Sequence, residues 1–337
     1  MAKAKVRLID VAELAGVSKS TASQYLNGRF EFMSSKTRER IEAAVKELNY
    51  APNPIARSLK TDTTKTIGVV VRDVTGHYTS RAIRGIDDYC KTSGYNVIIY
   101  NSDFDPEVEA RSLKSLSELR VDGLIIASSG QNDALIADYE SKGLPVVQFQ
   151  LEHNERAKNI VLSDYYQAAY EATDYLIQLG HQRICFATQD FQDVKSRNER
   201  FLGYQAALAQ HDITVDPALI LYWQRDGGLQ QTPQQLITAS GATAIFSQHL
   251  AVTTDLLKAF EQAQLSIPED VSLIGFDELP MAEFFKVPVT VVKQQPYQIG
   301  YQSAELLLKQ VQDKTQTQQR ITVGCELIKR QSCRQLG

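Results

Sequence analysis

Beyond residue 66 the chain alternates short apolar, β-branched runs with segments of helical spacing, and this alternation limits the possible folds more than any other feature. The apolar runs lie at 67–71, 96–100, 123–128, 145–149, 184–188, 244–248 and 271–276. Helical stretches such as 79–94 and 168–180 lie between them. Apolar runs of this kind are typical of parallel strands that are covered on both faces. The sequence therefore predicts doubly wound α/β lobes with right-handed crossovers, in which ligands bind beyond the carboxyl ends of the strands.

The first fifty residues have a different texture, with short helical segments and little else. Apolar residues recur at helical spacing over 8–15, and Gly16 breaks the run. Ser18 is a good N-cap for a second helix over 19–26, and we expect Ser35 to cap a third helix. Three short helices are typical of a DNA-binding domain.

The length of 337 residues fits a small domain together with a two-lobed one. The apolar share of 43% and the charged share of 23% are ordinary globular values. Residues 51–66 contain two prolines and read as a linker, although 54–59 can form a short helix that begins at Pro54. The sequence predicts a helical domain over 1–50, a hinge helix and linker over 51–66, and a two-lobed domain over 67–337.

The net charge of −4 hides an asymmetry between the two ends of the chain. Residues 1–62 hold eleven Lys and Arg against seven Asp and Glu, a net +4, which leaves −8 for the remainder. The basic end is therefore the expected polyanion binder. The cysteines Cys90, Cys185, Cys325 and Cys333 form no CxxC pair, so we expect no metal site and no cofactor. Without an export signal or a long apolar stretch, a cytoplasmic protein with no membrane contact is expected.

The segment GVSKSTASQYLNG (16–28) carries the strongest local signal for DNA binding. A helix of this sequence projects Lys19, Ser20, Ser23 and Gln24 on its polar side, opposite its apolar residues. A helix end with Lys and small hydroxyl residues suits phosphates and base edges in a major groove. Taken alone, the segment could also be an ordinary solvated helix.

The motifs LIDVAELAGVSKSTASQYLNG (8–28) and SSKTRERIEAAVKELNYAPNPIARSL (34–59) together resemble the lactose/galactose repressor family, and the similarity continues to LIKRQS (327–332). The resemblance implies a helix-turn-helix domain followed by a core like the periplasmic sugar-binding proteins. It also implies a homodimer that binds a near-palindromic double-stranded DNA operator and closes on a small effector. A transcription regulator, and most often a repressor, is expected.

The resemblance assigns roles to single residues of the DNA-binding part. Lys19 and Ser20 fall on base-reading positions, and Leu59 falls on a hinge wedge that enters the minor groove. Gln24 replaces the usual Arg, which favours adenine over guanine, although it could instead contact a phosphate or solvent. The predicted DNA-binding residues are Ser18, Lys19, Ser20, Thr21, Ser23, Gln24, Asn27, Asn53, Ala56, Arg57 and Leu59.

In the core, the resemblance places an effector-clamping arginine at Arg200 and an effector-binding acid at Asp277. A guanidinium offers paired donors and a carboxylate accepts from sugar hydroxyls, although Asp277 could instead belong to a surface ion pair. Trp223 falls in a loop region that often supplies a stacking ring, but a lone Trp is usually a core residue. The predicted effector-binding residues are His77, Tyr78, Asp164, Arg197, Arg200, Trp223, Gln248, His249, Asp277 and Gln294.

The chain departs from the family where Gln248 and His249 replace a common Asn-Asp pair. With Arg197 and Arg200 nearby, the loss of an acid favours an anionic effector. The alternative is that His249 points away and only caps a strand end. Similarity of SQYLNGRFEFMS and IGFDELPMAEFFKVPVTVVKQ to regulators of ketodeoxygluconate and uronate use suggests 2-keto-3-deoxygluconate as the effector. A neutral sugar or a sugar phosphate stays open.

Other functional classes find less support. The sequence lacks a Gly-rich phosphate loop after a strand, a GxSxG elbow and an HExxH motif, so no enzyme is predicted. A sugar-binding protein without a DNA role would share the lobes but would not need the basic helical segment in front.

Overall fold

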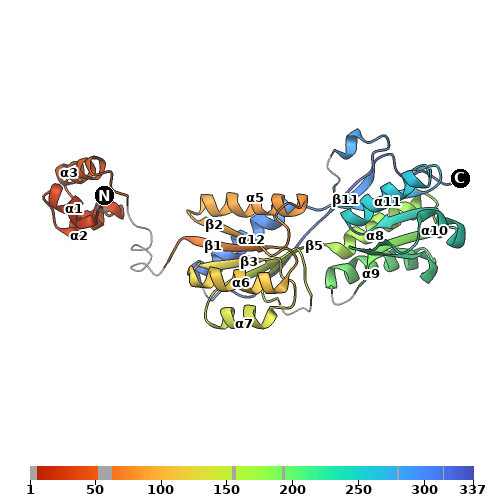
Figure 1. The fold of residues 1–337 in the computed structure, drawn as a ribbon, viewed down its shortest axis with the longest axis horizontal. Coiled ribbons are helices and arrows are strands. Elements are labelled where there is room, and N and C mark those ends of the chain that lie inside the picture. The colour runs from red at the N-terminus through yellow and green to blue at the C-terminus, as the bar shows by residue number, and fades with distance from the viewer. Residues whose placement is uncertain (1–5, 52–62, 154–156, 192–193, 279–280, 314) are drawn as a thin grey trace. The chain divides into compact units, whose positions relative to one another are not determined.

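A computed structural model describes residues 6–51, 63–153, 157–191, 194–278, 281–313 and 315–337. The chain divides into two compact units, residues 1–64 and residues 65–337 (Figure 1). Within the described ranges, no helix is both long enough and apolar enough to cross a membrane.

The first unit is a bundle of α1 (Leu8–Leu14), α2 (Lys19–Leu26) and α3 (Ser35–Glu47). Their shared apolar core contains Val11 and Ile41. Ser18 caps α2, since its Oγ accepts a hydrogen bond from the backbone N–H of Thr21 at 3.1 Å. The expectation that Ser35 caps α3 is wrong by one residue. Ser34 has the extended backbone of an N-cap, and its Oγ accepts from the N–H of Thr37 at 3.2 Å.

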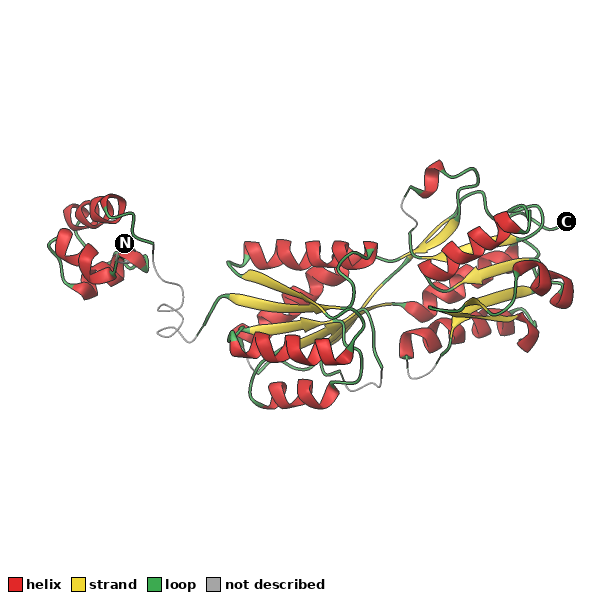
Figure 2. Ribbon diagram, viewed as in Figure 1, coloured by secondary structure: helices red, strands yellow, loops and turns green. Residues whose placement is uncertain are grey.

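The first lobe of the second unit is built on a parallel sheet with strand order β12-β5-β4-β3-β1-β2. Its strands are β1 (Thr66–Val71), β2 (Asn96–Asn101), β3 (Gly123–Ile126), β4 (Val146–Phe149), β5 (Ile160–Ser163) and β12 (Arg320–Val323). Helices α5 (His77–Thr92) and α12 (Pro296–Gln312) pack on one face, and α6 (Pro106–Glu118) and α7 (Asp133–Ser141) on the other (Figure 2).

The second lobe has strand order β13-β11-β10-β9-β6-β7-β8, parallel except for the pairs β7-β8 and β11-β13. Its strands are β6 (Ile184–Gln189), β7 (Ile220–Gln224), β8 (Gly228–Leu229), β9 (Ala244–Ser247), β10 (Ser272–Phe276), β11 (Thr290–Lys293) and β13 (Glu326–Ile328). Helices α8 (Tyr165–Gln178) and α9 (Lys195–Gln210) cover one face, and α10 (Pro233–Ser240) and α11 (Leu250–Gln262) cover the other.

Each apolar run predicted from the sequence contains a strand, and the predicted α/β fold class is confirmed. The two lobes exchange chain segments. The chain passes from the first sheet to α8 after β5, returns to the first lobe after β11, and passes to β13 after β12. These crossings place Asp164, Gln294 and Cys325 beside the junction of the lobes.

A close helix crossing recurs in both lobes. A Cβ atom on Gly85 of α5 would overlap the carbonyl oxygen of Tyr297 on α12, and a Cβ on Gly203 of α9 would overlap the carbonyl oxygen of Tyr166 on α8. Glycine at these points lets the helix backbones touch. The crossing in the second lobe fixes α9, the helix that carries Arg200, against the core.

Candidate functional site

The recognition helix α2 presents one polar side and buries the other. Ala22 is fully buried, whereas Lys19, Ser20 and Gln24 are exposed. The hydroxyl of Thr21 is hydrogen-bonded to Ser18 Oγ at 2.8 Å, so these two side chains serve the helix cap. The exposed set on α2 therefore coincides with the predicted base-reading residues.

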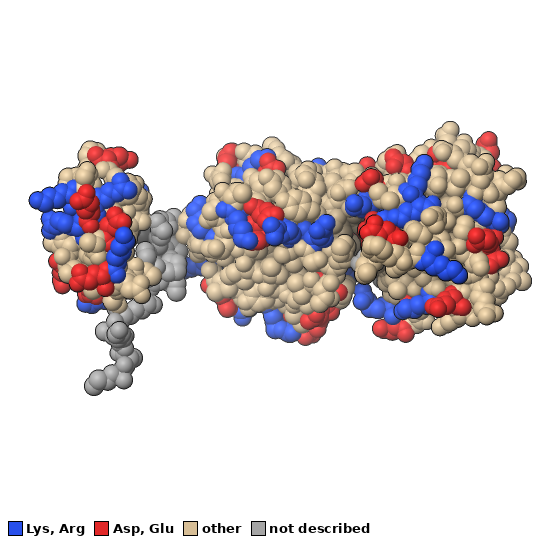
Figure 3. Space-filling model, turned by 90° about the horizontal axis from the view of Figure 1, so that it is seen from above, with Lys and Arg blue, Asp and Glu red and all other residues tan. Residues whose placement is uncertain are grey.

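The turn between α1 and α2 is held from α3. Gly16 has φ of 60°, a conformation that glycine adopts at no steric cost, and its carbonyl accepts from Arg40 Nη2 at 3.1 Å. At the end of α2, Asn27 Nδ2 donates to the carbonyl of Ser23 at 2.8 Å, which orders the helix C-terminus. Figure 3 shows Lys and Arg side chains mixed with Asp and Glu on this unit. The predicted hinge residues Asn53, Ala56, Arg57 and Leu59 lie outside the described residues.

Arg200 lies in the second unit as a buried cation between aromatic rings. Its guanidinium carbon is 4.3 Å from the ring centroid of Tyr165 and 4.2 Å from that of Phe276. Its Nη1 donates to Gln248 Oε1 at 3.0 Å. Ring stacking and a single amide partner hold the guanidinium in place, because a planar cation stacks on aromatic faces. Its position in the site is therefore fixed before any ligand binds.

Asp277 lies at the carboxyl end of β10 and forms a short chain of side-chain hydrogen bonds. Gln294 Nε2 donates to Asp277 Oδ1 at 2.5 Å, and Ser163 Oγ donates to Gln294 Oε1 at 2.5 Å. Burial raises the pKa of Asp277, while the bond from Gln294 and the charge of Arg200 act in the opposite direction. This end of the site offers acceptors of the kind that bind sugar hydroxyls.

Several buried polar atoms around these residues have no hydrogen-bond partner within the described part of the chain. They are Arg72 Nε, Tyr78 Oη, Ser196 Oγ, Arg200 Nε and Gln248 Nε2. Buried polar atoms in native proteins are normally paired, so a group of unpaired ones needs a cause. Burial, together with Tyr165 and Asp277, raises the pKa of Tyr78, so its hydroxyl keeps its proton and can donate. The unpaired atoms mark a place that fits a polar ligand.

His249 stands at the start of α11, where its Nδ1 accepts a hydrogen bond from the N–H of Ala251 at 3.1 Å. This contact leaves the ring proton on Nε2. Burial first, and then the positive charges of Arg200, Arg197, Arg225 and Arg72 in that order, together lower the pKa of His249 to about 3. His249 is therefore neutral at physiological pH and both caps α11 and borders the arginines.

Four arginines gather in this region, and we call Arg72, Arg197, Arg200 and Arg225 the arginine cluster. Burial lowers the pKa of Arg197 to about 10, helped by the charges of Arg200 and Arg72. Arg197 Nη1 donates to the backbone carbonyl of Asp190 at 2.7 Å. Among the described residues, no carboxylate forms a salt bridge with any member of the cluster. The cluster is thus suited to an anionic ligand.

Arg72 and Arg225 were not predicted from the sequence as effector-binding residues. Arg72 directly follows β1, and Arg225 directly follows β7. A charged residue just beyond a parallel strand stands at the ligand-binding end of a sheet, and this signal was available for Arg72. The same signal was available for Arg225, since the apolar run over 218–223 comes just before it.

Two predicted effector residues are not brought to the arginine cluster. Trp223 lies on β7 and not in a loop, so that part of the prediction is wrong. Its ring belongs to the hydrophobic core, and its Nε1 donates to Asp255 Oδ2 at 2.7 Å. Asp164 caps α8 by accepting from the N–H of Gln167 at 3.0 Å. By contrast, His77 is exposed at the start of α5, and its charge reaches Asp277.

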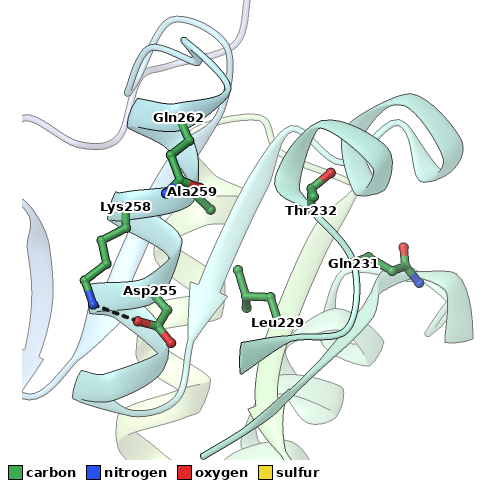
Figure 4. Close-up of a pocket in the computed structure, with 7 residues that line it drawn as sticks. All are labelled: Leu229, Gln231, Thr232, Asp255, Lys258, Ala259 and Gln262. Atoms are coloured by element: carbon green, nitrogen blue, oxygen red, sulfur yellow. Dashed lines mark hydrogen bonds and ion pairs between the residues drawn. The ribbon is translucent and has the colours of Figure 1, made fainter. Parts of the chain in front are cut away.

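A separate hollow of about 260 Å³ lies elsewhere in the second lobe, between β8, the segment before α10, and α11 (Figure 4). Lys258 pairs there with Asp255 at 3.2 Å, and Asp255 also accepts from Trp223. The lining residues are Leu229, Gln231, Thr232, Asp255, Lys258, Ala259 and Gln262. Because its charged groups already neutralise each other, this hollow is a weaker candidate than the arginine cluster.

Comparison with known proteins accounts for both units. Residues 7–53 match the family described as bacterial regulatory proteins, lacI family, and residues 173–333 match the periplasmic binding protein-like domain. The chain is 34% identical to EndR of Paenibacillus polymyxa, a probable HTH-type transcriptional regulator, over 93% of each chain. The chain belongs to the lacI family.

Other relatives of this lacI-family regulator agree. It is 32% identical to the HTH-type transcriptional repressor PurR of Photobacterium profundum, over 97% of this chain and 98% of that protein. Its fold matches the lac repressor dimer bound to operator and the anti-inducer ONPF, with a TM-score of 0.83, 26% identity, and coverage of 98% and 100%. The lacI-family chain is therefore a DNA-binding transcription regulator with an effector-binding core, and not an enzyme.

Proposed function

We propose that this lacI-family regulator binds a near-palindromic double-stranded operator as a homodimer and acts as a cytoplasmic repressor. The lac repressor dimer on its operator, a relative over 98% of this chain, supports this assembly. The proposal keeps the predicted domain limits: a helix-turn-helix over 1–50, a hinge helix and linker over 51–66, and a two-lobed effector-binding and dimerisation domain over 67–337.

The recognition helix reads the operator through Lys19, Ser20 and Gln24. Their exposure on one side of α2 supports this role. Lys19 suits guanine and Gln24 suits adenine, whereas Ser20 contacts either base. Leu59 and its neighbours in the hinge complete the interface in the minor groove.

The effector is a sugar acid, and the arginine cluster is the observation that carries this conclusion. Four guanidinium groups without a salt bridge to any described carboxylate favour an anion, while Asp277 and Gln294 favour hydroxyls. 2-Keto-3-deoxygluconate has both features and is the effector that we propose for testing. A neutral hexose would leave the cluster uncompensated, and a sugar phosphate would satisfy it by the same chemistry.

A gel shift on DNA from upstream of the chain's own and neighbouring genes tests this function. The protein is titrated first without ligand, then with 2-keto-3-deoxygluconate, galacturonate, glucose 6-phosphate or galactose. We expect specific binding that a sugar acid changes and galactose does not. Specific binding that responds only to galactose would contradict the anionic effector, and no sequence-specific binding to any of these fragments would contradict control of the adjacent genes.

A further inference from the structure

We infer that the anionic group of the effector binds between Arg72 of the first lobe and Arg225 of the second, with Phe104 as the ring that both arginines share. The inference rests on the proposed function and adds the two residues that recognise the charge. It also separates the site into an anion-binding end at Arg72 and Arg225 and a hydroxyl-binding end at Asp277 and Gln294.

The first observation is the position of Phe104. The Arg72 guanidinium carbon lies 4.6 Å from the ring centroid of Phe104, and the Arg225 guanidinium carbon lies 4.2 Å from it. Phe104 follows β2 in the first lobe, whereas Arg225 follows β7 in the second. One ring thus joins side chains that come from both lobes.

The second observation is the geometry of the gap. Because both guanidinium carbons lie within 4.6 Å of one centroid, they are at most about 9 Å apart. A carboxylate or phosphate beside the shared ring, with N–O distances of about 2.8 Å, can contact two guanidinium groups at such a separation. Arg72 Nε is buried and has no partner within the described part of the chain, so it is ready to donate.

The third observation is that Arg72 forms no salt bridge with a carboxylate of the described residues. Burial lowers its pKa, Arg225 lowers it further, and only Glu109 acts in the other direction. The carboxylate of Glu109 already accepts from Ser129 N, Ser129 Oγ and Asn132 Nδ2, at 2.8, 2.9 and 2.9 Å. Arg72 and Arg225 therefore repel each other across the lobes until an anion lies between them.

The fourth observation is the backbone that presents the ring. Asp103 and Phe104 have φ values of 52° and 61°, in the left-handed region that a bulky residue such as Phe rarely adopts. Conformations of this kind persist at ligand-binding sites where their surroundings hold them. The ring is 40% exposed, so it is not placed there to fill the core.

The contacts of Arg200 differ from those of Arg72 and Arg225 and suit a different role. Arg200 is stacked on Tyr165 and Phe276, and its charge acts on Asp277. Its local negative partner is thus provided by the protein, and its unpaired Nε suits a hydroxyl of the effector. Arg72 has only the charge of Glu109 near it, and that carboxylate is already hydrogen-bonded to Ser129 and Asn132.

Calorimetry of the full chain tests the inference with 2-keto-3-deoxygluconate, galacturonate, glucose 6-phosphate and galactose as probes. Arg72→Gln and Arg225→Gln should each raise the Kd of the best-binding anionic probe by about tenfold or more, because one charged partner is lost. Arg111→Gln is the matched control, since Arg111 is an exposed arginine on α6 with only Glu107 at 3.7 Å. It should bind as the wild type does.

The outcomes separate the inference from the proposed function. If a sugar acid binds and changes operator affinity equally in the wild type and in both variants, the inference is wrong while the proposed function stands. If only glucose 6-phosphate binds and the variants lose it, the anion-binding position stands with phosphate as its ligand. If no anionic probe binds, the inference and the sugar-acid effector are both wrong.

A charge reversal gives a second test that needs no ligand. Arg225→Glu places a carboxylate opposite Arg72, so the unliganded variant should unfold at a higher temperature than the wild type and should no longer gain stability from the anionic probe. Unfolding at a lower temperature, with the anionic probe still stabilising the variant, would show that Arg225 does not face Arg72 in this way.

Discussion

The side-chain amide of Gln294 donates a hydrogen bond to the carboxylate of Asp277 at 2.5 Å, which joins the end of β10 to the crossing after β11. The same amide accepts from Ser163 at the end of β5, in the first lobe. Asp277, the proposed effector contact, is thereby linked to the segments that cross between the two lobes.

We predict that Asp277→Asn stabilises the unliganded protein at neutral pH and weakens effector binding. Burial raises the pKa of Asp277 above its ordinary value of 3.8, so the ionised form is disfavoured in the folded state. The protonated carboxyl of Asp277 contributes its full share of stability below pH 3.8. This contribution is lost as the pH rises through the raised pKa that Asp277 has in the folded state. Asn does not ionise, so the variant avoids this loss of stability. Asn also tolerates the φ of 76° at this position, and its side-chain oxygen can still accept the hydrogen bond from Gln294.

Thermal unfolding between pH 4 and pH 8 measures this effect. The advantage of Asp277→Asn should grow with pH over the lower part of this range and then stay constant. Asp212→Asn is the control, because Asp212 is also left-handed, with φ of 57°, but exposed. A difference in unfolding temperature that does not depend on pH would show that the negative charge of Asp277 does not destabilise the folded state.

We predict that His249→Asn makes the protein more resistant to acid. Burial and the charges of the arginine cluster together lower the pKa of His249 from 6.5 to about 3. On acidification, His249 is therefore protonated at a higher pH in the unfolded chain than in the folded protein. The free energy of unfolding falls as the pH drops from 6.5 towards 3. Asn keeps the helix cap without titrating, so the free energy of unfolding of the variant should exceed that of the wild type by about 2 kcal/mol at pH 5.

Urea unfolding at pH 5 and pH 8 checks the acid response. The free energies of unfolding of the wild type and of His249→Asn should differ at pH 5 and be equal at pH 8. Equal differences at both values would mean that packing, and not protonation of His249, separates them.

We predict that Gln24→Arg moves the preferred base from adenine towards guanine at one symmetric pair of operator positions. Gln pairs best with the adenine edge, and Arg pairs with the two guanine acceptors. Selection from randomised operators with the two proteins in parallel reads this directly. Identical selected motifs would reduce Gln24 to a phosphate or solvent contact.

We predict that Leu59→Ala leaves the effector core folded and lowers specific operator affinity by about 1–3 kcal/mol, because the kink loses its apolar wedge. Leu59 lies outside the described residues, so this role rests on the family resemblance alone. Operator affinity and DNA bending are measured together, and thermal unfolding of the variant serves as the control. Wild-type values for both would show that Leu59 is not the wedge.

The fold was predictable because its signals are local. Runs such as 67–71 are apolar throughout, and Ser18 marks a helix start by its hydroxyl alone. β7 was not predicted, although residues 218–223 are apolar throughout and carry the same signal. Edge strands such as β13 bury fewer side chains than central strands, so their sequences show a weaker apolar pattern.

The effector site was predictable only in part, because it is assembled from strand ends that are distant in sequence. Arg200, Asp277 and Gln294 were found through the resemblance, which fixes their positions relative to known motifs. Arg72 and Arg225 lie outside the segments on which the resemblance rests, and their meeting at Phe104 depends on the three-dimensional approach of the two lobes. Trp223 was misplaced since its aromatic type fits a core as well as a binding site.

We predict that Arg200→Ala abolishes the effector response while operator binding survives. Arg200 is 6% exposed and donates to Gln248, so its loss removes a buried donor and leaves Gln248 Oε1 without this partner. Loss of one partner in a buried charged contact costs about 2–5 kcal/mol of effector binding. The recognition helix is untouched by the change, so specific DNA binding should persist. Calorimetry with the sugar acid and a gel shift with and without it measure both halves. An Arg200→Ala protein that still responds to its effector at wild-type concentrations would remove Arg200 from the site.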